Sequence, residues 1–205
     1  MDERIKLPKP IYKGSLSVEE AIKQRRTVRS FSSRPLPLNY LGQILWAAQG
    51  ITGETINFRA TPSAGIIYPL DVYAVVGQNA VEGLSEGVYR YIPKDHAVER
   101  LTNGDRREEI AKAAFGQSWM AQAPVLLVIS AEYDRLAERY GERAVRYAEL
   151  EAGHVGQNIF LQAEAEGLGA GIVGVSNVSE VNHLLEAPAG EEPLSIIPVG
   201  FKEQY

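Results

Sequence analysis

The segment from about Glu142 to Glu166 is the longest stretch of the chain that can form one helix, because no proline interrupts it. A surface helix buries its apolar residues in one stripe. Here the apolar positions provide contacts on more than one side, and they include Val145, Leu150, Val155, Ile159, Phe160 and Ala163. The pattern therefore predicts a helix that is buried between layers or packed against another subunit.

Other elements follow from capping residues and hydrophobic periodicity. Ser17 and Glu20 fit a capping box, which predicts a helix from near Val18 to Arg25 or Arg26. Further helices are expected over 38–49, 105–114 and 179–185, and strands over 71–76, 87–92, 124–130, 172–175 and 194–199. The elements do not alternate strictly as βαβ units, which predicts an α+β domain with a mostly antiparallel sheet. We expect one domain over 17–205, preceded by an extended arm over 1–16.

Composition limits the chemistry of this 205-residue chain, which contains no cysteine and has a formal net charge of −5. Disulfide scaffolds, thiolate nucleophiles, thiolate zinc sites and Cys-ligated clusters are excluded. Redox chemistry would need a bound cofactor, because the side chains cannot supply it. The sequence contains no metal motif of the HExxH type, and we expect no metal site.

The N-terminal residues and the longest apolar run indicate whether the protein is secreted or inserted in a membrane. The first residues include two acids and a proline where a signal peptide needs an apolar core. The run at 124–129 is far shorter than the ~20 residues of a membrane span. We expect a cytoplasmic protein without a membrane partner. A pI near 5.4 argues against binding to nucleic acid.

Positive charge is nevertheless concentrated over 21–34, which contains five basic residues and no acid. Where the helix gives way to extended chain, Arg25, Thr27 and Arg29 alternate onto one face. Two guanidiniums and a hydroxyl suit a terminal phosphate, because forked donors match its oxygens. The alternative is a solvated basic end of a helix, stabilised by the helix dipole.

Three glycine-containing segments suggest close approach to a flat group. Pro62–Gly65 forms a candidate tight turn before a strand, although an ordinary loop is the alternative. Gly153 and Gly156 each cost ~1 kcal/mol relative to alanine in a helix, so something is expected to pack against them. Gly167–Val175 follows a helix and opens a strand, which is the reverse of a dinucleotide fingerprint.

Two polar positions in the long helix and one basic position near the C-terminus are further candidate site residues. His154 and Asn158 share a helix face, but we interpret His154 as an interface residue and not as a metal ligand. The strand at 196–201 delivers Lys202 near the C-terminus.

Four segments together resemble the nitroreductase-like FMN flavoprotein superfamily, in particular its SagB-type (thiazoline/oxazoline) dehydrogenase branch. They are RRTVRSF (25–31), RATPSAGIIYPLDVYAVV (59–76), RYAELEAGHVGQNIFLQAEAEGLGAG (146–171) and IIPVGF (196–201). The resemblance spans roughly 17–202. It implies an α+β fold that binds FMN at the interface of an intertwined homodimer, with two sites built from both subunits and the long helix in the dimer core.

The resemblance also implies residue roles. Arg25 and Thr27 match positions that hold the FMN phosphate and ribityl chain, and Arg29 matches the basic position beside the flavin N1/O2 edge. A fixed cation there would stabilise the charge that reduction places on that edge. The full set of implied cofactor-binding positions is Arg25, Arg26, Thr27, Arg29, Pro62, Ser63, Ala64, Gly65, Val173, Gly174 and Lys202.

The implied activity is an FMN-dependent oxidoreductase. NADH or NADPH would reduce the flavin, and a flat acceptor such as a nitroaromatic or quinone would reoxidise it by a ping-pong mechanism. Two alternatives stay open: a SagB-like dehydrogenase that oxidises an azoline or another modified substrate with oxygen, and a non-catalytic flavin-binding protein.

Two departures from the family pattern bear on these alternatives. Ile66 and Ile67 stand where many relatives have an asparagine that contacts the flavin. Arg139 and Tyr140 are the nearest match to a Lys-Tyr pair of azoline-oxidising members. Arginine is a poor proton shuttle, because its pKa exceeds ~12. Tyr140 is the one candidate catalytic side chain.

Overall fold

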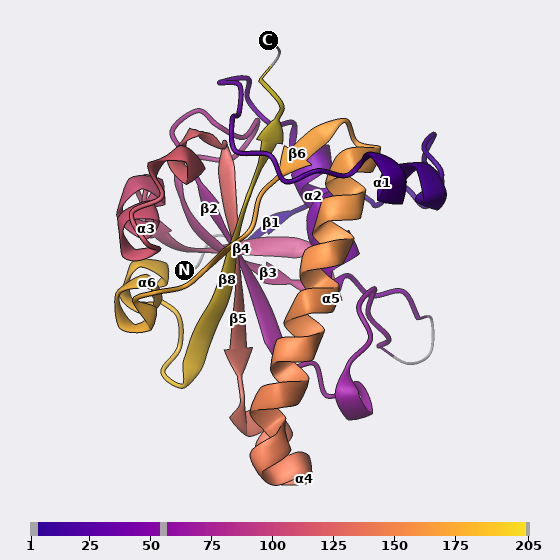
Figure 1. Cartoon of the computed structure of the whole chain (residues 1–205), viewed down its shortest axis with the longest axis vertical. Helices are drawn as coiled ribbons and strands as arrows, with labels where there is room; N and C mark the ends of the chain where they lie inside the picture. The colour runs from indigo at the N-terminus through magenta and orange to yellow at the C-terminus, as the bar shows by residue number, and fades with distance from the viewer. Residues whose placement is uncertain (1–3, 54–56, 204–205) are drawn as a thin grey trace.

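A twisted antiparallel sheet lies between two layers of helices in the computed structural model, which describes residues 4–53 and 57–203. Figure 1 shows α2 and α5 on one side of the strands and α3 and α6 on the other. The helices are α1 (Val18–Gln24), α2 (Leu38–Gln49), α3 (Arg107–Ala113), α4 (Asp134–Tyr140), α5 (Ala144–Ala165) and α6 (Val178–Leu185). The α+β prediction and the antiparallel sheet are confirmed.

The sheet has the strand order β1-β4-β3-β2-β5-β8-β6, and β7 also pairs with β8. All of these pairings are antiparallel. The strands are β1 (Arg4–Lys6), β2 (Leu70–Val76), β3 (Gly87–Ile92), β4 (Ala97–Asn103), β5 (Val125–Glu132), β6 (Leu168–Ala170), β7 (Val173–Gly174) and β8 (Glu191–Phe201). Strands β2 and β5 are almost fully buried because both of their faces are covered by helices.

Helix α5 covers one face of this sheet and packs beside α2. Its sheet-facing side is completely buried at Ala148, Val155 and Ile159. Its other side is not covered, and Leu150 is 55% exposed. The helix is thus buried against the sheet on one side only, and the second apolar side predicted from the sequence faces outward in a single chain.

The predicted arm is extended, and it contributes an unpredicted strand. Within the described residues of the arm, β1 pairs with β4 at the edge of the sheet. The His96 ring bonds to the Pro8 carbonyl and to the Tyr91 hydroxyl, each over 2.9 Å. Burial lowers the pKa of His96, although the Pro8 carbonyl opposes this shift. The arm therefore lies against the sheet edge before it leaves the body of the molecule.

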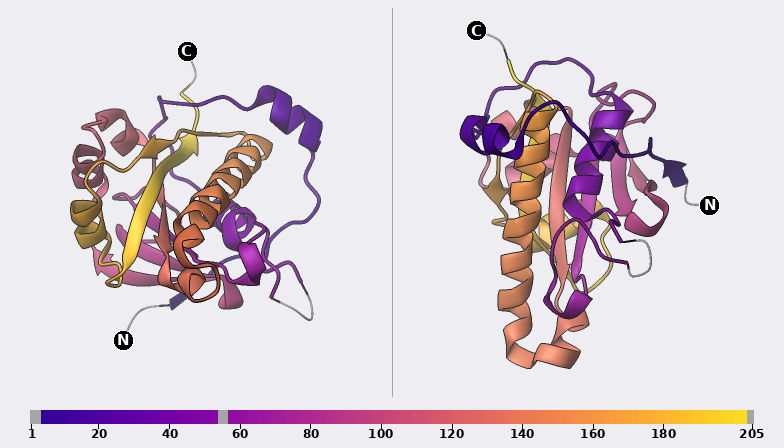
Figure 2. Two further views of the ribbon diagram at one scale, coloured as in Figure 1. Left: turned by 60° about the horizontal axis from the view of Figure 1, so that its bottom comes forward. Right: turned by 90° about the vertical axis from the view of Figure 1, so that its right-hand side faces the viewer.

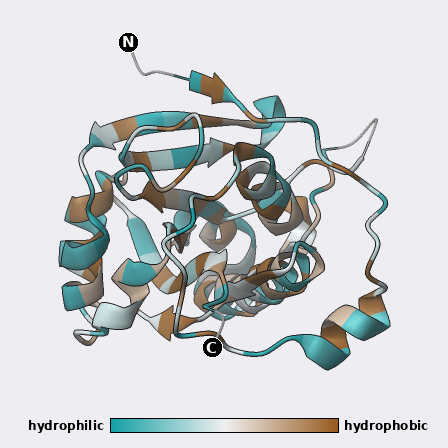
Figure 3. Ribbon diagram, turned by 90° about the horizontal axis from the view of Figure 1, so that it is seen from above, coloured by the Kyte–Doolittle hydropathy of each residue, from teal (hydrophilic) through white to brown (hydrophobic). Residues whose placement is uncertain are grey.

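Helix α1 stands at the edge of the molecule, joined to it by extended chain (Figure 2). The predicted capping box at Ser17 and Glu20 is present. Only Ala21 of this helix is buried, whereas Val18 and Ile22 are 65% and 56% exposed. Figure 3 shows hydrophobic and hydrophilic residues side by side on a short helix at the rim of the molecule. An outlying helix with exposed apolar side chains presents a surface suited to contact with another molecule.

Strands β1, β4 and β6 and helix α4 were not predicted, and the boundaries of the predicted helices and strands differ from the expected ones by a few residues. Across the described ranges, no helix combines the length and the apolar character that a bilayer crossing requires.

Candidate functional site

The segment 25–31 runs alongside β6 and the end of β8. Thr27 forms a bridge with Ala170, and the Val28 amide donates to the Ala170 carbonyl over 2.8 Å. Phe31 forms a second bridge, with Lys202. These backbone contacts fix the basic segment to the edge of the sheet, although the two parts are far apart in the sequence.

Gly169 makes this close approach possible. A Cβ atom at Gly169 would lie 2.8–2.9 Å from three side-chain atoms of Val28, closer than ordinary packing allows. The glycine-containing segment at 167–171 therefore receives the basic segment.

Arg25 and Arg29 each lie over an aromatic ring, and neither belongs to an ion pair within the part of the chain that the structure describes. The Arg25 guanidinium is 5.3 Å from the Phe160 ring centre, and that of Arg29 is 5.9 Å from the Trp119 ring centre. The aromatic rings hold these cations without neutralising them. Neither guanidinium is therefore neutralised by a carboxylate of the described chain, and their role in binding a phosphate stays a prediction.

Arg26 and Lys202 are engaged differently. Arg26 donates to the carbonyls of Lys23 and Arg25 and closes the end of α1. The Lys202 ammonium donates to both carboxylate oxygens of Glu164, over 2.8 and 2.9 Å. It also lines an open cavity of about 590 Å³ together with Arg29. If Lys202 binds the FMN phosphate, its ammonium group would have to interact with Glu164 and with the phosphate at the same time.

The predicted turn at Pro62–Gly65 forms a strained loop. Gly65, Ile66 and Tyr68 have φ values of 63°, 62° and 58°. This left-handed backbone is unusual for a β-branched residue such as Ile66. Ser63 Oγ accepts a bond from the Tyr68 amide over 2.9 Å, which closes the loop. Pro62 is exposed, and Ala64 is half-buried.

Tyr140 lies at this loop. A Cβ atom at Gly65 would lie 2.7 Å from the Tyr140 hydroxyl and 2.8 Å from Arg139 Nη1. The Tyr140 ring also meets Tyr147 edge-on, with ring centres 5.0 Å apart. The structure therefore places the candidate catalytic tyrosine beside the predicted flavin-contacting loop.

The two groups of predicted residues lie at different parts of α5 in one chain. Arg25 contacts Phe160 and Lys202 bonds to Glu164, whereas the Ser63 hydroxyl interacts with Glu151. The step from 151 to 164 corresponds to about 20 Å along a helix and to about 220° around it. The loop 62–65 and the basic segment therefore flank opposite sides of α5, and the chain does not bring them together.

Within the described residues, Val173 and Gly174 form no hydrogen bond to either group. They form β7, which pairs with Ile196 and Ser195 of β8. The preceding Ile172 is exposed, and its side chain lies 3.6 Å from the position of a Cβ atom at Gly156.

The outward face of α5 separates the two groups. A Cβ atom at Gly153 would have no neighbour within 4 Å, so no part of the chain that the structure describes packs against this glycine. His154 is exposed on the same face. Asn158 points instead to the Ala47 carbonyl and to Thr61, so His154 and Asn158 do not form a pair.

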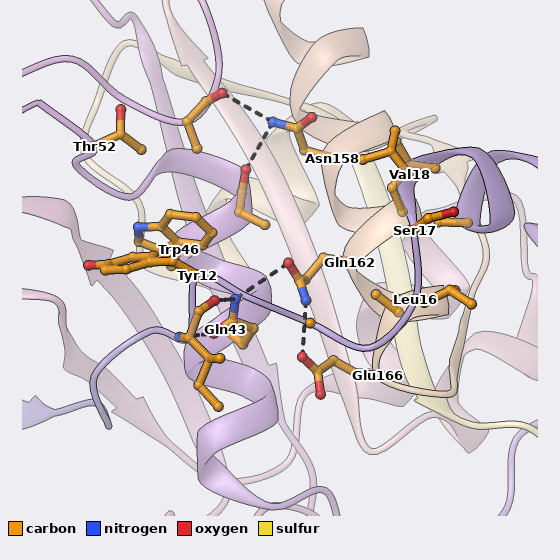
Figure 4. Close-up of a pocket in the computed structure, with 17 residues that line it drawn as sticks. Tyr12, Leu16, Ser17, Val18, Gln43, Trp46, Thr52, Asn158, Gln162 and Glu166 are labelled. Atoms are coloured by element: carbon orange, nitrogen blue, oxygen red, sulfur yellow. Dashed lines mark hydrogen bonds between the residues drawn. The ribbon is translucent and has the colours of Figure 1, made fainter.

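A second cavity lies between the arm, α1, α2 and α5. Its volume is about 420 Å³, and Figure 4 shows its aromatic wall of Tyr12 and Trp46 and its polar residues Gln43, Gln162 and Glu166. Gln43 bonds to both the amide and the carbonyl of Ile11, over 2.8 and 2.9 Å. The residues that line this cavity include none of the predicted cofactor-binding positions.

Sequence reasoning missed Glu151, a buried carboxyl group on α5 that lies behind the loop 62–65. Burial raises its pKa to about 7, and the Ser63 hydroxyl, the Gln49 amide and the charge of Arg59 oppose the shift. The sequence did contain a signal for this burial. Glu151 lies four residues before the apolar Val155, and this spacing places both side chains on the same face of the helix.

The close approach of Gly169 to Val28 leads to a prediction. Gly169→Ala is expected to destabilise the fold by about 1–3 kcal/mol, because the new methyl group displaces Val28. It should also weaken binding of FMN if the segment 25–29 holds that cofactor. Thermal unfolding and an FMN titration measure the two effects, and Gly14→Ala is the control, since a Cβ atom there meets nothing within 4 Å and the residue is not among the predicted FMN contacts. An unchanged melting temperature would contradict the close approach.

Comparison with known proteins identifies the family. A model of the Nitroreductase family matches residues 22–201. A protein of Methanocaldococcus jannaschii named as a nitroreductase is 42% identical over 187 residues, which cover 91% of this chain and 92% of that protein. A crystal structure named as a nitroreductase, from Ralstonia eutropha, superposes with a TM-score of 0.86 at 28% identity and covers 98% of this chain and 90% of that one.

Two shorter matches point to more distant relatives. The NADPH-flavin oxidoreductase of Vibrio harveyi is 28% identical over 116 residues, which cover 53% of this chain and 48% of that protein. The trifolitoxin-processing protein TfxB of Rhizobium leguminosarum is 29% identical over 121 residues, which cover 57% of this chain and 32% of that protein. The matched residues include both the basic segment and the long helix, and the chain therefore belongs to the nitroreductase family of oxidoreductases.

Proposed function

We propose that this protein is an FMN-dependent NAD(P)H oxidoreductase that acts as a homodimer on a small flat acceptor. The observation that carries the proposal is the pair of uncompensated guanidiniums at Arg25 and Arg29, held on aromatic rings in a segment that is fixed to β6. The family and the NADPH-flavin oxidoreductase relative support the same chemistry.

Arg25 and Thr27 would hold the phosphate and ribityl chain, and Arg29 would lie near the N1/O2 edge of the ring system. An exposed threonine between two arginines supplies a hydroxyl and two forked donors, which suit an esterified phosphate. Bound FMN would supply the hydride-transfer chemistry that the side chains lack. Arg29 would then stabilise the negative charge that develops on the flavin during reduction.

The homodimer is needed because the predicted contacts are divided between two parts of the chain. The loop 62–65 and the segment 25–29 flank opposite sides of α5, with the exposed Leu150 and Gly153 between them. A second copy packed on this face would bring its own loop toward the basic segment of the first. Each site would then consist of residues from both subunits.

The direct test is anaerobic reduction. NADH or NADPH is expected to bleach the visible absorbance of the FMN-loaded protein rapidly, and addition of a quinone or nitroaromatic should restore it. A protein that binds FMN but is not bleached by either nucleotide would contradict the reductase. A protein that cannot be loaded with FMN at all would contradict the flavin site as well.

The position of Tyr140 supports a second candidate, a dehydrogenase that oxidises a modified substrate with oxygen as acceptor. Its hydroxyl lies against the loop at Gly65, where a proton could be exchanged with a substrate. Arg139 stands where azoline-oxidising members carry a lysine, so this tyrosine would have to act without a lysine partner. Slow bleaching by NAD(P)H, together with rapid reduction by an azoline-containing peptide, would favour this candidate.

A further inference from the structure

The cavity between the arm, α1, α2 and α5 has the dimensions of a small-molecule site. Its volume of about 420 Å³ falls within the range of ~300–1,000 Å³ for ligand pockets, which are mostly apolar and carry a few fixed polar groups. Leu16 and Val18 lie on the side of the cavity opposite Trp46 (Figure 4). None of the predicted flavin contacts lines the cavity, so a ligand here would occupy a second site.

Two aromatic rings form one wall of the cavity. The ring centres of Tyr12 and Trp46 lie 5.4 Å apart, and the ring planes meet at 53°. Tyr12 is 79% exposed, whereas Trp46 is half-buried. The faces of aromatic rings attract cations, and the rings also pack against other flat groups. This wall is therefore suited to a flat ring or to a cation.

A row of three side chains forms the polar part of the cavity (Figure 4). Gln43 is fixed by two bonds to the backbone of Ile11, and its amide nitrogen also lies 3.4 Å from Gln162 Oε1. The Gln162 amide nitrogen then donates to Glu166 Oε1 over 3.0 Å. The two amides therefore fix the Glu166 carboxylate as a hydrogen-bond acceptor.

Glu166 gives the cavity its charge. It is the only charged residue among the described residues that line the cavity, and it belongs to no ion pair in the same part of the chain. Burial raises the pKa of Glu166, and the bond from Gln162 opposes this shift. A partly buried carboxylate is stabilised by a paired cation, because it has lost part of its contact with water. The cavity therefore favours a cation and disfavours an anion.

We propose that this cavity binds a small arylalkylammonium ion, which is a flat aromatic ring joined by a short chain to a protonated amine. The ammonium group donates to Glu166, and the ring packs against Trp46 and Tyr12. Both parts of the ligand are needed, because the aromatic wall and the carboxylate belong to different parts of the same cavity. The inference goes beyond the proposed function and does not depend on FMN.

Two other occupants fit the cavity less well. A phosphate or carboxylate ligand would meet the Glu166 carboxylate without a compensating cation, since no lysine or arginine of the described ranges lines the cavity. The second occupant is another copy of the chain. The face proposed for the dimer contains Leu150 and Gly153, and neither residue lines this cavity.

Three probes of matched shape test the requirement for charge. Phenethylamine, phenethyl alcohol and hydrocinnamate carry the same ring and end in a cation, a neutral hydroxyl and an anion at neutral pH. Isothermal titration of the full chain is expected to show binding of the amine that is at least about tenfold tighter than binding of the alcohol, because hydrogen bonds to charged groups are stronger. Hydrocinnamate is expected not to bind. Equal affinities for the amine and the alcohol would overturn the inference.

Glu166→Gln removes the charge and keeps the shape of the side chain. The affinity for phenethylamine is expected to fall about tenfold or more, whereas the affinity for phenethyl alcohol should stay within about twofold. The alcohol thus reports that the cavity has kept its shape. Glu149→Gln is the matched control, because Glu149 is an exposed glutamate of α5 that does not line the cavity. Wild-type affinity for the amine in Glu166→Gln, or an equal loss in Glu149→Gln, would overturn the inference.

The fluorescence of Trp46 locates the bound amine. The chain contains two tryptophans, so Trp119→Phe leaves Trp46 as the only one. Saturation with phenethylamine is expected to change the emission of Trp46, and the midpoint of this change should agree with the dissociation constant from calorimetry. Binding of the amine without any change in emission would place it elsewhere and overturn the inference.

The result can be separated from the proposed function. Phenethylamine should bind with equal affinity whether or not FMN is present. A protein that binds the amine but not FMN would support this site and contradict the flavin site. A dimer that does not bind the amine would overturn the inference, because another part of the assembly then occupies or closes the cavity.

Discussion

Replacing both Arg25 and Arg29 with alanine is expected to weaken FMN binding by about 10²–10⁴-fold. A hydrogen bond to a charged group is worth about 1.5–3 kcal/mol, and about 1.4 kcal/mol corresponds to a factor of ten in affinity. Both guanidiniums are free of ion pairs in the described structure, so their loss is not offset by the release of an internal partner. The change in affinity is measured by titrating the apoprotein with FMN and recording the quenching of flavin fluorescence.

The control for this prediction is a second double variant with the same loss of charge. Lys23→Ala with Arg34→Ala removes two cations from the same basic stretch, where both residues are exposed. These positions are not among the predicted contacts, so the control should retain affinity within a few-fold. Equal losses in the two double variants would mean that FMN responds only to the overall charge of the segment, and the assignment of Arg25 and Arg29 would fail.

Gly153→Phe is expected to convert the protein into a monomer that no longer retains FMN. In a single chain the position is open, with no atom within 4 Å of a Cβ atom, and phenylalanine has a higher helix propensity than glycine. The isolated subunit should therefore fold normally. A phenylalanine would nevertheless prevent a second copy from packing closely against α5. Sedimentation analysis and flavin content after gel filtration measure the two effects.

Lys112→Phe provides the comparison, because it places the same side chain on an exposed position of α3, on the opposite side of the sheet. It should leave both the molecular mass and the flavin content unchanged. A Gly153→Phe protein that remains dimeric would contradict the proposed interface. A monomer that still retains FMN would show that one chain suffices for the site.

Much of the secondary structure could be predicted because its signals are local. The capping box at Ser17 and Glu20 and the stop at Gly50 act within a few residues of the helices that they delimit. Strand β5 could also be predicted from its continuous apolar run, because both faces of that strand are buried. Strand β4 alternates less clearly and was missed, since only its first two residues are buried.

The candidate site was predictable only in its parts. The basic segment and the small-residue turn were found from composition and spacing, and their binding roles stay predictions. The Lys202–Glu164 ion pair and the contact between Tyr140 and Gly65 join residues that are far apart along the chain. No periodic pattern encodes such pairs, because they arise from the way in which the layers pack.

The sequence by itself determined most of the helices and strands, the absence of cysteine chemistry and the positions where cations and glycines are concentrated. Only the tertiary structure decided that the basic segment and the strained loop flank opposite sides of α5 and that the outward face of this helix has no cover within one chain. It also decided that Glu151 is buried behind the loop. The physical reason is that propensity and capping act over one or two turns, whereas burial and desolvation depend on which distant segments meet.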